Sequence, residues 1–139
     1  MRIVAGLARI GGVIALSGAA LAVLGCHSAF VNAVVRNHTQ KPISLLELDY
    51  PSASFGTQTL EPGSDFRYKF KVLGSGVTKL SWTDLTETQI QTSGPDLAEG
   101  DEGSLTVTVE PAFVEWNPHF KNRELAPSRS VPHALMMPK

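Results

Sequence analysis

The chain has 139 residues, of which 42% are hydrophobic and 18% are charged, and its formal net charge at pH 7 is −1. This length accommodates one domain, and the lack of a basic excess argues against a nucleic-acid-binding protein. Cys26 is the only cysteine, so no disulfide can form within the chain.

The N-terminal segment has the three parts of an export signal. Arg2 and Arg9 give it a positive start, an uncharged apolar run occupies residues 10–24, and small residues lie near a processing point. The run of about 15 residues is shorter than the roughly 20 that a membrane-spanning helix needs. We therefore predict a removable signal peptide over residues 1–25, in preference to a permanent membrane helix.

The apolar run ends in Val23-Leu24-Gly25-Cys26, which resembles the lipobox of bacterial lipoproteins. Over the first 26 residues, the resemblance implies cleavage between Gly25 and Cys26 and a diacylglycerol group on the sulfur of Cys26. It usually implies a further acyl chain, such as palmitate, on the freed amine, because a single chain binds a membrane only reversibly. His27, which is not aspartate, favours the outer membrane under the family's sorting rule. The alternative is an ordinary signal peptide followed by an incidental thiol.

After a short linker at residues 26–28, apolar and polar residues alternate with the period of a half-buried strand. The alternation is clearest at residues 65–72 and 104–110, where Leu105 and Val107 are expected to face a core. Weaker patterns predict further strands at residues 30–36, 43–50, 55–60, 77–83 and 87–91.

The strand at residues 65–72 has one basic face. Alternation turns Arg67, Lys69 and Lys71 toward water, with Lys79 as an extension on a neighbouring strand. This row is a candidate for binding anionic headgroups or an acidic partner. The alternative is a solvated face whose charge discourages pairing at a sheet edge. The residues expected to face inward on the same strand are Phe66, Tyr68, Phe70 and Val72.

Turn-forming clusters such as Gly94-Pro95-Asp96 separate the predicted strands. About seven short strands at intervals of roughly 8–12 residues predict an all-β domain, a small antiparallel immunoglobulin-like sandwich. We expect this domain to cover residues 29–120. Residues 121–139 contain several prolines and no periodic apolar face, and they are predicted to form a flexible tail.

Residues 37–73 also resemble uncharacterised exported sandwich domains of bacteria. The resemblance covers about a third of the chain and implies no known activity. It is carried by Pro42-Ile43, Tyr50-Pro51, Ser54-Phe55-Gly56 and Leu60-Glu61-Pro62-Gly63.

Three aromatic residues, Phe113, Trp116 and Phe120, follow the last predicted strand. They are candidates for an exposed patch that binds a partner. The preferred interpretation is that they fold back and cover a sheet edge.

No motif points to a catalytic or zinc site. The histidines His27, His38, His119 and His133 have no paired metal-ligand spacing, and no nucleophile elbow occurs. We therefore predict no metal and no cofactor. A hydrolase whose residues meet only in three dimensions is the alternative, with Glu47, Asp49 and His38 as its candidate residues.

An acidic loop contains Asp96, Glu99, Asp101 and Glu102. Carboxylates of this kind bind calcium, and a calcium-dependent adhesion module is a further alternative. The favoured interpretation is a solvated turn, because acidic residues interspersed with glycine are common in loops.

Taken together, the sequence predicts a lipid-anchored protein of the cell envelope, facing the periplasm from the outer membrane where the host has two membranes. We expect a non-enzymatic binding or structural module that contacts the membrane through Cys26 and binds an envelope protein, with no nucleic-acid partner. Fold alone cannot name its ligand, because sandwiches support many unrelated activities.

Overall fold

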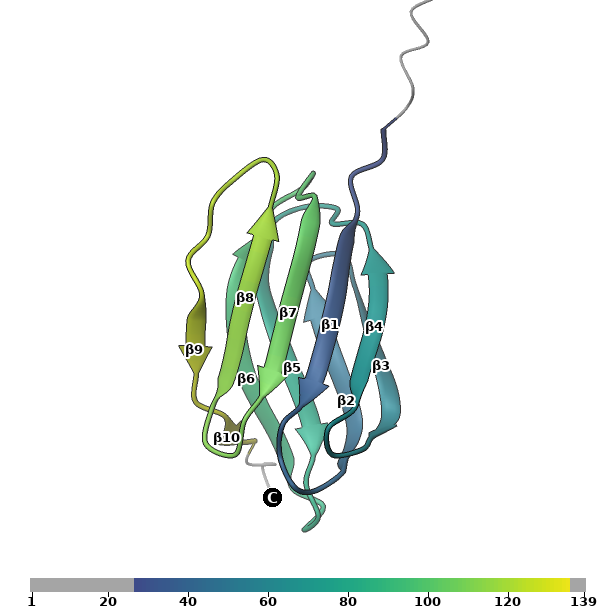
Figure 1. The fold of residues 1–139 in the computed structure, drawn as a ribbon, viewed down its shortest axis with the longest axis vertical. Coiled ribbons are helices and arrows are strands. Elements are labelled where there is room, and N and C mark those ends of the chain that lie inside the picture. The colour runs from purple at the N-terminus through teal and green to yellow at the C-terminus, as the bar shows by residue number, and fades with distance from the viewer. Residues whose placement is uncertain (1–26, 136–139) are drawn as a thin grey trace, which may run out of the picture.

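Strands make up the regular structure of residues 27–135, the part of the chain that the computed structural model describes. They form two five-stranded sheets packed face to face (Figure 1), which confirms the predicted all-β sandwich. The predicted signal peptide and Cys26 lie outside the described residues. The strands are β1 (Val31–Asn37), β2 (Ile43–Tyr50), β3 (Ala53–Leu60), β4 (Asp65–Phe70), β5 (Gly76–Thr83), β6 (Gln89–Leu97), β7 (Gly103–Val109), β8 (Val114–Phe120), β9 (Ser128–Ser130) and β10 (His133–Ala134).

The first sheet has the strand order β4-β1-β7-β8-β9, and the second has the order β10-β6-β5-β2-β3. Paired strands are antiparallel, as predicted, apart from β1 and β7, which are parallel. The β2–β3, β5–β6 and β7–β8 pairs are local hairpins. In contrast, β1 meets β4 only after the chain has crossed to the second sheet and returned. Within residues 27–135, no helix has the length and apolar character of a membrane span.

The core lies between the sheets and is built from every second residue of the inner strands. Leu105, Val107 and Val109 of β7 are buried, as the alternation predicts, and burying one such side chain contributes roughly 1.5–3 kcal/mol. Tyr68, which was predicted to face inward, is 43% exposed. It lies on β4, an edge strand, and its ring stacks on that of Phe55 with centroids 4.4 Å apart.

One predicted turn is part of a strand. Gly94-Pro95-Asp96 lies inside β6, and the pairing of β6 with β5 shifts register opposite Val77 and Lys79. Proline cannot donate to a sheet and is found at such irregularities. The carbonyl of Pro95 accepts a hydrogen bond of 2.8 Å from the hydroxyl of Thr78. The turn prediction was therefore wrong, because the same residues suit a strand irregularity.

The chain after Val109 contributes more to the sandwich than the sequence indicates. Trp116 lies on β8, between β7 and β9, and is fully buried. It therefore neither forms an exposed patch nor covers an edge. Short strands continue past Phe120, where we placed the end of the folded domain: β9 pairs with β8, and β10 pairs with β6 of the other sheet.

Candidate functional site

The two ends of the sandwich differ in what they carry. The described chain starts at one end, where His27 leads into β1; we call this end the N-terminal pole (Figure 1). At the opposite end, loops 38–42, 84–88 and 110–113 surround a pocket of about 660 Å³, which we call the distal pocket. These three loops are far apart in the sequence and belong to both sheets.

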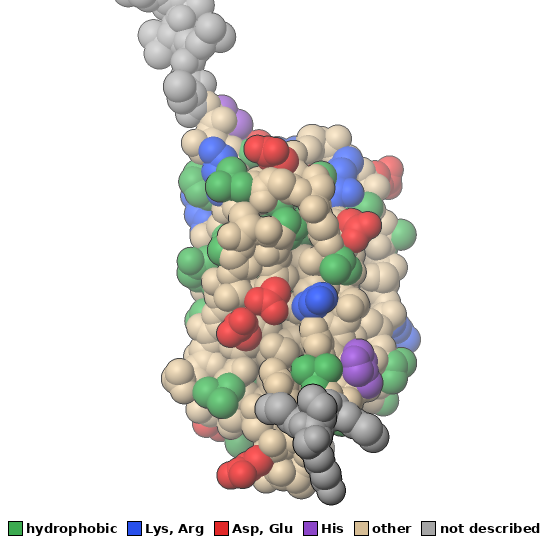
Figure 2. Space-filling model, turned by 180° about the vertical axis from the view of Figure 1, so that it is seen from behind, with side chains coloured by type: hydrophobic (Ala, Val, Ile, Leu, Met, Phe, Trp, Pro, Cys, Tyr) green, Lys and Arg blue, Asp and Glu red, His purple; other side chains and the backbone are tan. Residues whose placement is uncertain are grey.

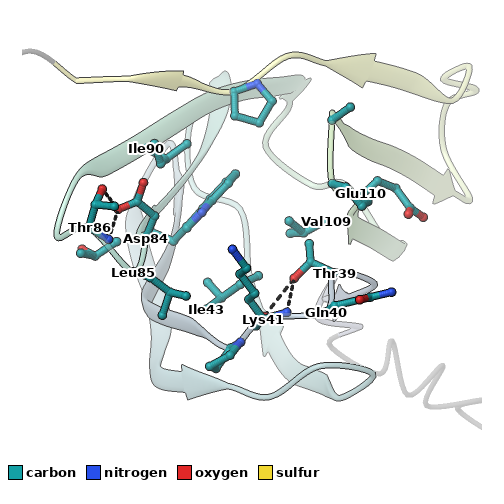
Figure 3. A pocket seen from close by; sticks show the side chains of 16 residues that line it. Thr39, Gln40, Lys41, Ile43, Asp84, Leu85, Thr86, Ile90, Val109 and Glu110 are labelled. Atoms are coloured by element: carbon teal, nitrogen blue, oxygen red, sulfur yellow. Dashed lines mark hydrogen bonds between the residues drawn. The ribbon is translucent and has the colours of Figure 1, made fainter.

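The distal pocket has apolar walls. Ile43 and Val109 are buried at its base, Trp82 and Ile90 are partly buried in its wall, and Leu85 is 62% exposed. Figure 3 shows two sides. Asp84, Leu85, Thr86 and Ile90 lie on one, Thr39, Gln40, Val109 and Glu110 lie on the other, and Lys41 extends between them.

Asn37 fixes the loop at residues 38–42. Its side chain is buried and donates hydrogen bonds of 2.9 Å to the carbonyls of Lys41 and Leu60. Its carbonyl oxygen accepts bonds of 2.9 and 2.6 Å from the amide and hydroxyl of Thr39. Both donors and the acceptor of the Asn37 amide group are thus used. These bonds tie the loop to β1 and to the end of β3.

Asp84 fixes the loop at residues 84–88 in a similar way. One of its carboxylate oxygens accepts bonds of 2.7 and 2.8 Å from the hydroxyl and amide of Thr86, and a bond of 2.9 Å from the amide of Thr88. These bonds, chiefly that from the Thr86 hydroxyl, hold the pKa of Asp84 below its usual range. Asp84 therefore remains ionised and keeps its loop closed at neutral pH.

The charges around the distal pocket are unevenly paired. His38 and Glu110 approach each other to 3.0 Å on one side. Lys41 makes no ion pair with any described residue, and it is exposed. The two carboxylates of the lining already have partners, since Asp84 accepts hydrogen bonds within its own loop and Glu110 pairs with His38. Among the described lining residues, the ammonium of Lys41 is the charged group that is left to contact an anionic group on a ligand.

The candidate hydrolase residues are not brought together. Glu47 and Asp49 point outward from β2, opposite Ser81 and Lys79 of β5. Figure 2 shows this sheet face, where a few acidic and basic side chains lie among uncharged ones. His38 lies at the end of the sandwich and bonds to Glu110. Among residues 27–135, no three histidine, cysteine or acidic side chains gather in the way a metal ion requires.

The acidic loop is folded around a basic residue. Asp101 is fully buried, and its two carboxylate oxygens accept hydrogen bonds of 2.7 Å from Nε and Nη2 of Arg123. Glu102 bonds to Lys121 at 2.8 Å. These carboxylates are bound by cations of the protein itself, so the loop does not present four free ligands to calcium.

The predicted basic row is divided by the fold. Arg67 and Lys69 lie on the exposed side of β4, and Lys71 follows the end of this strand. Lys79 does not extend the row, because its strand β5 belongs to the second sheet. Arg67 also pairs with Asp65 at 3.6 Å.

Sequence reasoning missed the distal pocket. Its loops carry a visible signal, because Asn37 and Asp84 each precede a threonine by two residues, a spacing typical of side chains that close tight turns. The signal predicts rigid loops but not that the loops meet. A scan against protein-family models and a search of curated proteins both found no match for the chain.

Proposed function

We propose that this chain is a lipid-anchored binding module of the cell envelope, held by Cys26, and that the distal pocket is its ligand site. The observation that carries the proposal is the position of the pocket. It lies at the end of β1 opposite to His27, and the seven residues of β1 span about 20 Å. A domain tethered through its N-terminus would thus direct the pocket away from the membrane.

The two fixed loops also support a binding role. A site whose loops are ordered before the ligand arrives loses less conformational entropy on binding, which improves affinity. Buried Asn37 orders loop 38–42, and ionised Asp84 orders loop 84–88. The apolar walls of the pocket remain accessible between the two loops. Small-molecule sites likewise combine apolar walls with polar groups at fixed positions.

The lining indicates the chemistry of the ligand. A volume of about 660 Å³ lies within the roughly 300–1,000 Å³ of ligand pockets. Trp82, Ile43 and Ile90 would cover an apolar body, and Lys41 would pair with a negative group. The proposed ligand is therefore an amphipathic molecule or peptide segment with one anionic group.

The anchor is tested by intact mass spectrometry of the protein extracted in detergent from its host. The mature N-terminus is expected at Cys26 with added acyl mass, because two or more buried chains are needed for a stable anchor. Cys26→Ala is expected to lose both the acyl mass and the membrane association. An unmodified Cys26, or a retained segment over residues 1–25, would contradict the anchor.

The pocket is tested by NMR with naphthalene-2-sulfonate, a rigid apolar body with one anionic group. Amide shifts are expected in loops 38–42 and 84–88. Lys41→Gln is expected to weaken binding about tenfold, because a charge-assisted contact is lost. The neutral sulfonamide of naphthalene is expected to bind equally to the wild type and this variant.

Lys79→Gln is the matched control, since Lys79 lies on the outer face of β5, away from the distal pocket. It removes the same charge and is expected to leave sulfonate binding unchanged. Shifts spread over the whole surface, or equal losses from the two substitutions, would refute the pocket as the ligand site.

A further inference from the structure

A second hollow, of about 410 Å³, lies at the N-terminal pole, where the described chain begins. His27 and Ser28 line it, and both follow Cys26 directly in the sequence. Its other lining side chains are mainly polar or basic, in contrast to the apolar walls of the distal pocket. Those that matter here are Phe30, Asn32, Lys69, Ser104, His119 and Lys121.

The register of the first sheet builds this hollow. Lys69 of β4 is paired with Asn32 of β1, Asn32 with Ser104 of β7, and Ser104 with His119 of β8. Residues paired across adjacent strands point to the same face. Four neighbouring strands therefore present a lysine, an amide, a hydroxyl and an imidazole in one row on the outer face.

A lysine lies at each end of the hollow: Lys69, the first residue of the row, and Lys121, which follows β8. The ammonium of Lys69 lies 4.6 Å from the centre of the Phe30 ring, which fixes its position by a cation–π contact. At the other end, Lys121 bonds to Glu102 at 2.8 Å, and the same carboxylate oxygen lies 2.7 Å from Nε2 of His27. Glu102 is the only carboxylate among the described lining residues, so the charge of one lysine stays uncompensated.

We infer that this hollow binds a phosphate-bearing anionic group. Phosphate oxygens accept several hydrogen bonds at once, and the row offers ammonium, amide and hydroxyl donors side by side, together with an imidazole. The inference rests on the proposed function for the source of the phosphate: beside a lipidated Cys26, the hollow would face the headgroups of the anchoring membrane. Lysines near a membrane surface are attracted to anionic lipids.

The first experiment uses inorganic phosphate and does not depend on the anchor. Phosphate added to the detergent-extracted protein is expected to shift the amides of Asn32, Ser104 and His119 in NMR spectra. The double variant Lys69→Gln/Lys121→Gln is expected to weaken this binding about tenfold. The matched control, Arg36→Gln/Lys79→Gln, removes two positive charges that line neither pocket and is expected to leave phosphate binding at this hollow unchanged.

The second experiment places the protein in nanodiscs whose headgroups carry a paramagnetic label. With equal parts of phosphatidylglycerol and phosphatidylcholine, the same amides are expected to broaden more than with phosphatidylcholine alone, and the double variant is expected to remove this difference. A response to phosphate without one to anionic discs supports the site and assigns it to free phosphate. No response to either, or broadening in both discs that the double variant does not change, would overturn the inference.

The lipid anchor and the phosphate site can be refuted independently of each other. If mass spectrometry finds no acyl group on Cys26, the phosphate titration still measures the hollow. If the acyl group is present and neither phosphate nor anionic discs act on the row, only the hollow is refuted. The thermal melting temperature of each variant is measured first, so that a loss of binding is not confused with a loss of folding.

Discussion

Trp116→Ala is expected to lower the free energy of unfolding by about 3–5 kcal/mol, the cost typical of removing a large aromatic side chain from a core. Trp116 is fully buried on β8. Its indole N–H donates a hydrogen bond of 2.8 Å to the hydroxyl of Ser130 on β9. The substitution removes both the packing and this link to the edge strand, and chemical denaturation measures the loss.

A substitution at Gly94, on β6 of the opposite sheet, tests how tightly the core is packed around Trp116. A Cβ atom at Gly94 would lie 2.5 Å from both the hydroxyl oxygen of Thr78 and the Cε3 atom of Trp116. Gly94→Ala is therefore expected to cost about 1–3 kcal/mol through overpacking. Gly76→Ala is the control, because its new Cβ would approach Pro51 no closer than 3.5 Å. Equal stabilities for the two variants, or a loss below about 1 kcal/mol for Trp116→Ala, would contradict this account of the core.

The strands with regular alternation were predictable from sequence. Leu105, Val107 and Val109 follow the period-two pattern without interruption, and all three are buried. Val114 and Trp116 on β8 follow the same period, but Pro118 argues against a strand in the sequence because proline cannot donate a hydrogen bond to a sheet. The structure tolerates this proline because β9 pairs with β8 only at residues 114–116, so the strand has no neighbour on that side at Pro118.

The two candidate sites could not be predicted in the same way. Both depend on long-range pairing, which a local pattern does not encode. The row at the N-terminal pole exists because β1 is parallel to β7 in one particular register, with Asn32 beside Ser104. The distal pocket exists because loop 38–42, which crosses from the first sheet to the second, and loop 84–88, which joins β5 to β6 within the second sheet, meet at one end. A shift of one residue in the β1–β7 register would turn the row into the core.

Asp101→Asn is expected to lower the free energy of unfolding by about 3 kcal/mol at neutral pH, at the lower end for breaking a buried ion pair, because Arg123 keeps some contact with water. Asp101 is fully buried and binds Arg123 through both carboxylate oxygens at 2.7 Å, and it accepts a further bond of 2.8 Å from the amide of Ala98. Glu99→Gln, at an exposed position in the same loop, is the control and is expected to be neutral.

The pH dependence of this loss identifies its cause. Burial alone would raise the pKa of Asp101, but the hydrogen bonds from Arg123 and Ala98 outweigh burial and hold the pKa below its usual range. An aspartate in the unfolded chain titrates near pH 3.9, so the ionised Asp101 contributes its stability fully above that pH. The contribution falls as the pH drops through the lower pKa of the folded state, because both states are then protonated.

The difference in stability between the wild type and Asp101→Asn should therefore be constant from about pH 5 to 7 and shrink below about pH 4. Urea denaturation at several pH values measures it. Glu99→Gln should show no such trend. A difference that persists unchanged at low pH would mean that Asp101 stabilises the loop by shape and neutral hydrogen bonds. The charge of Arg123 would then play no part in joining the loop after β6 to the segment after β8.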